Sequence, residues 1–451
     1  MRGGRGAGPS LLGTQQSRGC PEDRGDAPRG GYRVSDGPSV SVVVVSHGRP
    51  DSLTLCLRAL VQQVYDPFEI VVVACKAGRR RIDTRPELYN RVKVVAFDER
   101  NISQGRNLGI AEAAGEVVAF IDDDAMAEPL WLHHLAPVFL DDRVGAATGY
   151  VRGRNGISFQ HRLTDVGPEA DSRPVRVKGD EPRLIAPPDG RGIKTEGTNM
   201  AFRRDLLLEL QGFDPAYRFY LDETDLNLRL AEQGILSAVA PLAQVHHGVA
   251  SSPRRRTDRV PESLFDVGAS LAYFLRRHSL AEDYSPAGRA ERRRRQRSLI
   301  GHMIDGRIEP RDVNRILATF DEGWAEGMGR EMLPLPGIEP SGAEFLAYRA
   351  DLPRLGHAVV AGRTWQARSR RAEALRLSEA GYHVTAMLLS PTARYHRAWF
   401  DAEGYWVQRG GLFGRSVRQA PLIRIQSFGK RVRAEVRRLS SVRGPARNGP
   451  V

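Results

Sequence analysis

The stretch that most constrains the fold of this chain is EVVAFIDDDA, residues 116–125. Residues 117–121 form a short, continuous apolar run, which is typical of a buried strand. Three adjacent carboxylates follow, and such groups repel one another unless water or a cation compensates their charge. An isolated run of this kind is often only a solvated acidic turn. At the carboxyl end of a strand in an open α/β sheet, where ligands collect, we expect Asp122 and Asp124 to offer oxygen ligands to Mg²⁺ or Mn²⁺.

The segments around this stretch alternate between strand and helix patterns. A valine-rich buried strand, a helix and two further strands precede it, in the order SVSVVVVSH, SLTLCLRALVQQV, PFEIVVVAC and RVKVVAF. The stretch NISQGRNLGIAEAAGE then predicts a loop and a helix that lead into the aspartate strand. This order predicts the α/β class, with a doubly wound, mostly parallel, Rossmann-like sheet.

The two ends of the chain differ in composition from this part. Residues 1–38 are rich in Gly, Arg, Pro and Ser, which predicts a disordered leader. Residues 281–350 are expected to form a basic helical linker region. Residues 351–430 contain a strand, a helix and a strand, HAVVAG, RRAEALRLSEAG and YHVTAMLL, which predict a small α/β accessory module. The arginine-rich residues 431–451 are expected to be a disordered tail.

The charge and cysteine content limit the environment and the partners. The chain of 451 residues has three cysteines, a formal net charge of +13 and no run of eighteen apolar residues. With no apolar region after the first arginines either, we expect a cytoplasmic protein without a membrane span. The basic run GRAERRRRQR, residues 288–297, is either a solvated helical face or a peripheral contact with the inner membrane face. It contains no aromatic residue for stacking, so no specific nucleic acid partner is expected.

Four sequence blocks within residues 39–250 resemble, in order and spacing, family 2 glycosyltransferases of the GT-A fold: VSVVVVSHGRPDSLTLCLRAL, NISQGRNLGIAEAAGEVVAFIDDDA, EGTNMAFRRDLLLELQGFD and YLDETDLNLRLAEQG. The resemblance implies a GT-A-type catalytic domain over residues 39–280. It implies a metal-dependent, inverting transferase that moves a hexose or deoxyhexose from a nucleotide-sugar. The acceptor would be a glycan, a lipid-linked sugar or a small molecule, as in the biosynthesis of cell-surface polysaccharides.

The resemblance also implies the donor and metal site. Asp122 and Asp124 would hold a manganese or magnesium ion that bridges the donor diphosphate. One histidine of the pair His246 and His247 would complete the metal site, with His246 in the better register. The residues implied to contact the donor are Ser46, Arg106, Asp122, Asp123 and Asn199. The chain departs from the family pattern at Ala74-Cys75, where a carboxylate or amide that contacts the base is usual.

The block DETD, residues 222–225, is expected to supply the general base. An inverting transfer needs a carboxylate to take the proton of the acceptor hydroxyl, and neighbouring carboxylates raise one another's pKa. The family register favours Glu223. Because the order here is Asp-Glu and not Glu-Asp, Asp222 remains a second candidate. A helix start that carries acids to suit the helix dipole would show the same letters.

The sequence leaves two other classes of protein open. The first is a non-catalytic basic protein that binds nucleic acid or an anionic surface on a degenerate GT-A domain. The second, less favoured, is a haloacid dehalogenase-like phosphatase, whose D-x-D continues differently from the Ala125-Met126 found here. The chain lacks the Q-x-x-R-W block and the membrane helices of processive synthases, which favours transfer of single sugars.

Overall fold

The computed structural model describes residues 37–248, 254–350 and 354–447. The predicted leader, residues 1–38, lies outside these residues except for its last two positions. Within the described ranges, none of the helices is both long enough and apolar enough to cross a bilayer.

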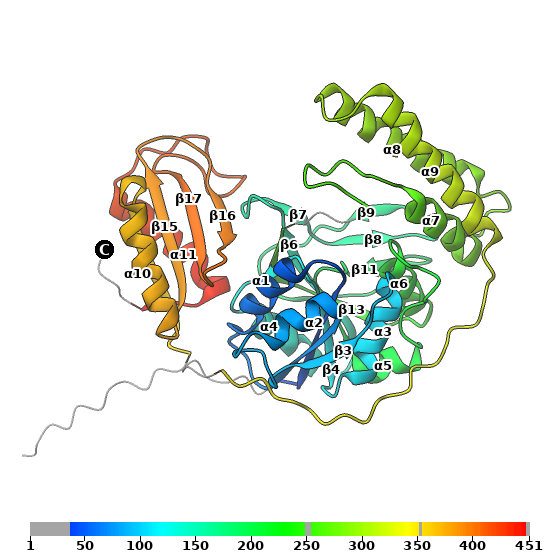
Figure 1. Ribbon diagram of the computed structural model, residues 1–451, viewed down its shortest axis with the longest axis horizontal. Helices are drawn as coiled ribbons and strands as arrows, with labels where there is room; N and C mark the ends of the chain where they lie inside the picture. The colour runs from blue at the N-terminus through cyan, green and yellow to red at the C-terminus, as the bar shows by residue number, and fades with distance from the viewer. Residues whose placement is uncertain (1–36, 249–253, 351–353, 448–451) are drawn as a thin grey trace, which may run out of the picture. The chain divides into compact units, whose positions relative to one another are not determined.

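A ten-stranded sheet forms the centre of the fold (Figure 1). Its strands are β1 (Val40–Ser46), β2 (Phe68–Ala74), β3 (Lys93–Ala96), β4 (Val117–Asp122), β5 (Ala125–Ala127), β6 (Val144–Arg152), β7 (Phe159–His161), β10 (Arg183–Ile185), β12 (Met200–Arg203) and β13 (Leu236–His247). The order β4-β1-β2-β3 is parallel throughout. On the other side of β4, β12 is antiparallel to both β4 and β6, and β13 runs parallel to β6.

Helices cover both faces of this sheet. They are α1 (Pro50–Leu60), α2 (Lys76–Asp83) and α4 (Trp131–Leu135) on one face, with the short η1 (Ala136–Leu140), and α3 (Ile102–Glu112), α5 (Arg204–Glu209) and α6 (Asp222–Glu232) on the other. The alternation of side chains along β1 explains the two layers, because Val42 and Val44 join the core under α1 while Val43 joins the core under α3. The predicted α/β class and mostly parallel sheet are confirmed.

Residues 150–194 add a small sheet beside the main one, in the order β11-β8-β9. Its strands are β8 (Thr164–Val166), β9 (Ser172–Pro174) and β11 (Gly192–Lys194). α6 packs against β11, so this sheet lies beside the start of that helix.

Three helices follow: α7 (Phe265–His278), α8 (Ser285–Ile304) and α9 (Pro310–Gly329). They share one apolar core with Tyr217, Leu221 and Leu228. α7 and α9 pack very closely, because a Cβ atom at Gly323 or Gly327 would overlap the backbone carbonyl of Phe265 or Ala269. The boundary predicted at residue 280 therefore falls between helices that share a core.

After α9 the chain returns along the main sheet as an extended segment. The backbone N–H of Tyr348 donates to the carbonyl of Phe68 (2.8 Å), and the Tyr348 ring is buried in the core below α1.

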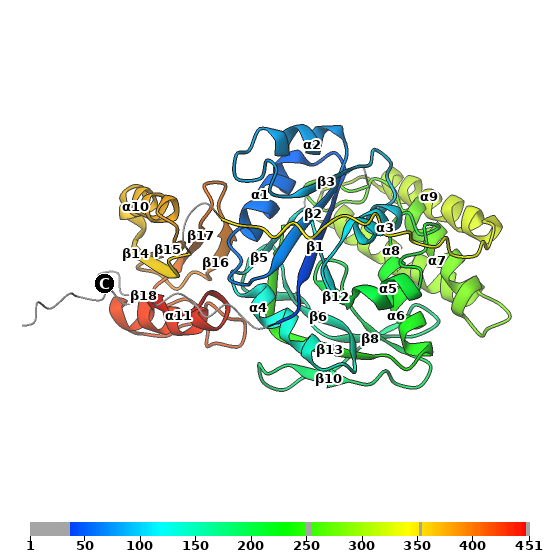
Figure 2. The same ribbon diagram turned by 90° about the horizontal axis from the view of Figure 1, so that it is seen from below.

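The C-terminal module has its own five-stranded sheet, ordered β16-β17-β15-β14-β18. Its elements are β14 (His357–Arg363), η2 (Thr364–Gln366), α10 (Ala367–Glu379), β15 (His383–Ser390), β16 (Arg397–Phe400), β17 (Trp406–Gly411), α11 (Phe428–Arg443) and β18 (Ala446–Arg447). β14, β15 and β17 are parallel, as the predicted βαβ unit requires. α10 and α11 cover opposite faces of the sheet (Figure 2).

The prediction of a disordered tail over residues 431–451 is wrong for residues 431–447. Residues 431–443 belong to α11, and 446–447 pair with β14 as β18. Val432, Leu439 and Val442 are buried against the sheet, at the spacing of one helical face. The many arginines between them give this segment the composition of a disordered tail, although its apolar residues recur with the period of a helix. Residues 448–451 lie outside the described ranges.

Candidate active site

The site lies at the carboxyl ends of β1 and β4, which are neighbours in the sheet. Val45 lies opposite Asp122 in the parallel register, so Ser46 and the three aspartates reach the same edge. β13 brings its last residues to this edge through pairing with β5, with His247 opposite Ala125. The sheet topology therefore joins groups that are more than a hundred residues apart in the sequence.

Asp122, Asp124 and His247 form a group whose ligand atoms all lie within 4.8 Å of one another. His247 Nε2 is 3.3 Å from Asp124 Oδ1, and Thr198 Oγ1 donates to Asp122 Oδ2 (2.6 Å). Two carboxylates and one imidazole suit Mn²⁺ and also accept Mg²⁺, which both leave positions for phosphate oxygens. The two carboxylates and the imidazole found here therefore fit the expected cation.

His246, the histidine favoured from the sequence, does not join this group. Adjacent residues of a strand point to opposite faces, and His246 points into the protein, where its Nε2 is 2.7 Å from Glu128 Oε1. Burial lowers the pKa of His246 to about 4, so it is neutral at pH 7. Contrary to the register expected from the sequence, His246 lies outside this group, and His247 is the histidine that lies within it.

Asp123 connects residues that follow β1 to those that follow β4 at this edge of the sheet. It is fully buried, accepts a hydrogen bond from Ser46 Oγ (2.7 Å) and pairs with Arg49. Burial raises the pKa of Asp123 to about 7, although Arg49 opposes the shift. Direct contact between Asp123 and a donor is contradicted by this burial. Ser46 is itself 3% exposed and its hydroxyl is committed to Asp123, which makes it a positioning residue at this edge.

Asn199 also has a structural place instead of the predicted donor contact. Its side chain is fully buried, accepts from Trp131 Nε1 (2.8 Å) and donates to the carbonyls of Tyr150 (3.2 Å) and Ala243 (2.9 Å). These bonds tie β12 to its surroundings. The neighbouring Thr198, not Asn199, reaches the metal group.

Glu223 lies at the first turn of α6. The two residues before the helix, Tyr220 and Leu221, have positive φ angles of 72° and 67°, which is unusual for bulky side chains and typical of functional sites. The Glu223 side chain keeps 16% of its surface exposed, and Lys194 Nζ lies 3.7 Å from its Oε1. Burial, and then the negative charge of Asp222, raise the pKa of Glu223 well above its usual range.

Arg106 connects the two groups of carboxylates. Its guanidinium pairs with Asp222 and lies 3.7 Å from Asp122 Oδ1, and it also donates to the carbonyl of Gly197 (3.3 Å). Asp222 is thus held in a close ion pair, whereas the cation beside Glu223, Lys194, lies 3.7 Å away. Of the two candidate bases, the geometry favours Glu223.

Comparison with known proteins finds a family match for the part of the chain that holds the aspartate edge. Residues 41–210 match the family model described as Glycosyl transferase family 2. This segment of the chain is therefore similar to glycosyltransferases of family 2. The matched segment runs from β1 into α5 and includes the aspartate edge, but it ends before Glu223 and His247.

Individual relatives match parts of this chain. The glucosyl-dolichyl phosphate glucuronosyltransferase of Haloferax volcanii is 29% identical over 39% of the chain. The O-antigen biosynthesis protein RfbC of Myxococcus xanthus is also 29% identical, over 51% of the chain. The chain spans 56% and 19% of the length of these two relatives. The solved mannosyltransferase PcManGT of Pyrobaculum calidifontis is 16% identical with a TM-score of 0.40, and the match covers 66% of this chain and 90% of that one.

Several site residues were not singled out from the sequence. Arg49 follows β1 within the block SHGRPDS, where it pairs with Asp123 and lies 3.3 Å from Asp124. Thr198 stands in the block EGTNM, next to the asparagine that was chosen. Lys194 comes from β11, in a region with little pattern, so no sequence signal pointed to it.

Proposed function

We propose that this chain is a metal-dependent, inverting glycosyltransferase with a catalytic domain over residues 39–280. One observation carries the proposal: a cation site and a carboxylate with a raised pKa open on the same sheet edge and are linked by Arg106. The cation site is Asp122, Asp124 and His247, and the carboxylate is Glu223. The match of residues 41–210 to the family 2 model supports a nucleotide-sugar as donor.

The first half of the site would bind the donor diphosphate. A bound divalent cation supplies positive charge that neutralises the leaving nucleoside diphosphate. Asp124 and His247 are held 3.3 Å apart before any ligand binds. Thr198 orients Asp122 through a hydrogen bond of 2.6 Å. Arg49 adds a second positive group beside Asp124. These contacts fix the ligands in advance, which lowers the cost of binding.

The second half would activate the acceptor. An acceptor hydroxyl is a weak nucleophile at pH 7, and a carboxylate that takes its proton accelerates attack on the anomeric carbon. Glu223 suits this role because its raised pKa makes it a stronger base than an ordinary glutamate. The proton passes to a Glu223 oxygen as the hydroxyl oxygen attacks, and attack from the face opposite the leaving group inverts the anomeric configuration.

The donor sugar is proposed to be a hexose or deoxyhexose, and the acceptor a glycan or lipid-linked sugar. The names of two relatives support the acceptor class: one is a glucuronosyltransferase that acts on a glucosyl-dolichyl phosphate, and one is an O-antigen biosynthesis protein. On this basis we propose a role in cell-surface polysaccharide biosynthesis.

The proposal is tested with a panel of nucleotide-sugars whose binding is read from the melting temperature, with Mn²⁺ and with a chelator. One donor should raise the melting temperature only with the cation, as mass action requires. Product formed from that donor is then identified by mass spectrometry, and its anomeric configuration by NMR. The proposal fails if no donor shifts the melting temperature in Mn²⁺, or if a shift is identical in the chelator.

A further inference from the structure

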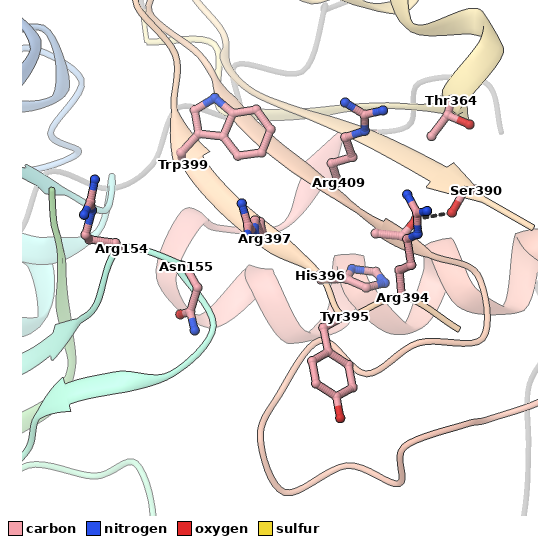
Figure 3. A pocket seen from close by; sticks show the side chains of 11 residues that line it. Arg154, Asn155, Thr364, Ser390, Arg394, Tyr395, His396, Arg397, Trp399 and Arg409 are labelled. Atoms are coloured by element: carbon pink, nitrogen blue, oxygen red, sulfur yellow. Dashed lines mark hydrogen bonds between the residues drawn. The ribbon is translucent and has the colours of Figure 1, made fainter. Parts of the chain in front are cut away.

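A ligand-sized cavity lies mainly on the C-terminal module, and most of the residues that line it are outside the segment that matches the family. It has a volume of about 890 Å³, within the range of small-molecule sites (Figure 3). Thr364, Ser390 and Gly410 line it, and they stand at or directly after the carboxyl ends of β14, β15 and β17. These three strands are parallel. This is the edge at which open α/β sheets bind their ligands.

The charged side chains around this cavity are all arginines. Arg394, Arg397 and Arg409 come from the module, and Arg154 joins them from the connection between β6 and β7 (Figure 3). None of the described residues that line the cavity is acidic. His396, below them, is buried, and burial lowers its pKa to about 4, so it adds no charge at pH 7.

Arg397 and Arg409 stand directly opposite each other on the antiparallel strands β16 and β17. Like charges in such a cross-strand pair destabilise a sheet. Over the described ranges neither guanidinium has a carboxylate within 4.0 Å, although arginines elsewhere on the module, such as Arg431 and Arg438, pair with Glu435. The two guanidinium groups therefore repel each other, and a bound anionic ligand would relieve this repulsion.

The same cavity offers flat surfaces for a ring. Trp399 is half-buried on β16, and Tyr395 is 55% exposed with the guanidinium of Arg415 stacked on it, 4.3 Å from the ring centroid. In Figure 3 the labelled side chains of Trp399, Arg409 and Arg397 face the same hollow. The planar fork of an arginine matches phosphate oxygens in pairs, and aromatic faces bind bases or sugar rings.

We propose that this cavity binds a diphosphate-bearing ligand without a metal ion. Arg397 and Arg409 are the principal hydrogen-bond donors to the phosphates, and Arg394 adds a third cation. The ring of Trp399 packs against the group attached to the diphosphate. The site is independent of the proposed transferase activity, because it shares none of the residues of the cation site. Its ligand is either a nucleoside diphosphate or a lipid-linked diphosphate, which have the diphosphate in common.

The test titrates inorganic pyrophosphate into the full chain by calorimetry, in a chelator so that the cation site cannot contribute. We expect saturable binding at one site per chain. The double variant Arg397→Gln/Arg409→Gln should weaken it at least tenfold. The matched control Arg433→Gln/Arg437→Gln removes the same charge from exposed positions of α11 that do not line the cavity, and should stay within twofold.

Unfolding is measured on the same samples. Loss of the facing arginines should leave the melting temperature unchanged or raised, because a like-charge pair is removed. Equal pyrophosphate affinity in parent and double variant would overturn the proposal, and so would an equal loss in the control variant. Uridine diphosphate and farnesyl diphosphate then distinguish a nucleoside diphosphate from a lipid-linked diphosphate, because the natural class should bind more tightly. Trp399→Leu should weaken binding of the tighter of the two without changing pyrophosphate binding.

Discussion

Arg443 on the last helix donates two hydrogen bonds, of 2.6 and 2.9 Å, to the carboxylate of Glu128, 315 residues earlier in the chain. Both side chains are 2% exposed. The same Glu128 oxygen that accepts from Arg443 lies 2.7 Å from His246, the neighbour of the metal-site histidine. A buried ion pair therefore joins the C-terminal module to Glu128, which in turn contacts the strand that carries His247.

Arg443→Met should lower the free energy of unfolding by about 3–5 kcal/mol, because it leaves the buried Glu128 without its cation. The change is measured by urea denaturation. Adding Glu128→Gln should restore part of the loss, since the uncompensated charge disappears. Arg437→Met, at an exposed position of the same helix, is the control and should stay within about 0.5 kcal/mol. A loss for Arg443→Met no larger than the control's would contradict the role of the pair.

The adjacent histidines should behave differently when each is replaced. His247→Ala removes a proposed metal ligand and should weaken Mn²⁺ binding by at least about tenfold. Loss of a residue that only hydrogen-bonds to a ligand already costs about this much, so loss of the ligand itself should cost no less. His246→Ala should change Mn²⁺ affinity by less than threefold, but lower the unfolding midpoint because Glu128 loses a buried partner. Calorimetry with Mn²⁺ and urea denaturation separate the two effects. The reverse pattern would return His246 to the metal site.

Glu223→Gln should reduce turnover by about 10²- to 10⁴-fold while donor and Mn²⁺ affinities remain near those of the parent. The amide keeps the size of the side chain and removes the proton acceptor. Asp222→Asn is the comparison: it breaks the pair with Arg106 and should affect binding as well as turnover. Steady-state rates and donor binding are measured for both. Unchanged turnover in Glu223→Gln would show that the base lies elsewhere.

The raised pKa of Glu223 also predicts a dependence of stability on pH. A carboxyl whose folded-state pKa lies above its unfolded value favours the folded state when protonated. Its contribution is present below the unfolded pKa, about 4.3, and is lost as pH rises through the folded pKa. Glu223→Gln removes this loss. The free energy of unfolding of the variant, relative to the parent, should therefore increase between pH 5 and pH 9 in denaturant titrations. A constant difference over this range would mean that the pKa is not raised.

Membrane contact through α8 remains a prediction, and the structure indicates which arginines of the helix are free to make it. Within the described part of the chain, Arg292, Arg294 and Arg295 of the basic run have carboxylate partners, whereas Arg289, Arg293 and Arg297 are exposed at a spacing of four with no ion pair. Replacing the exposed three by Gln should abolish flotation with anionic liposomes at low salt, since each contributes about 1 kcal/mol.

The control for this experiment replaces the three paired arginines by Gln, which changes the net charge equally. This control should float more strongly than the variant of the exposed three. If the parent chain does not float at low salt, α8 is a solvated face, and the predicted contact with the inner membrane face is wrong.

Much of the catalytic fold could be predicted because its strands are short, apolar and bounded by turn signals. Val117–Ile121 followed by three aspartates located one strand end correctly, and the spacing of apolar residues located the helices. The tail helix was missed for a related reason: its apolar positions are separated by arginines, and only their period of three to four residues indicated a helix.

The site could be predicted as a set of segments but not as a set of side chains. Asp122, Asp124 and Glu223 could be proposed from the sequence because their chemistry is explicit. The choice between His246 and His247 depends on which face of β13 meets β5, and a register of this kind is set by partners elsewhere in the chain. Asn199 and Thr198 were confused for the same reason, because neighbours in a strand-like turn point in opposite directions.

The close packing of α7 on α9 has a consequence for how the chain tolerates mutation. α7 carries Arg277 and His278, which hold the fully buried Asp225 on α6, two residues from Glu223. A methyl group at Gly323 or Gly327 would push α7 outward and move this anchor. In a survey of random variants, these two glycines should be as intolerant of substitution as the aspartates, although they touch no substrate.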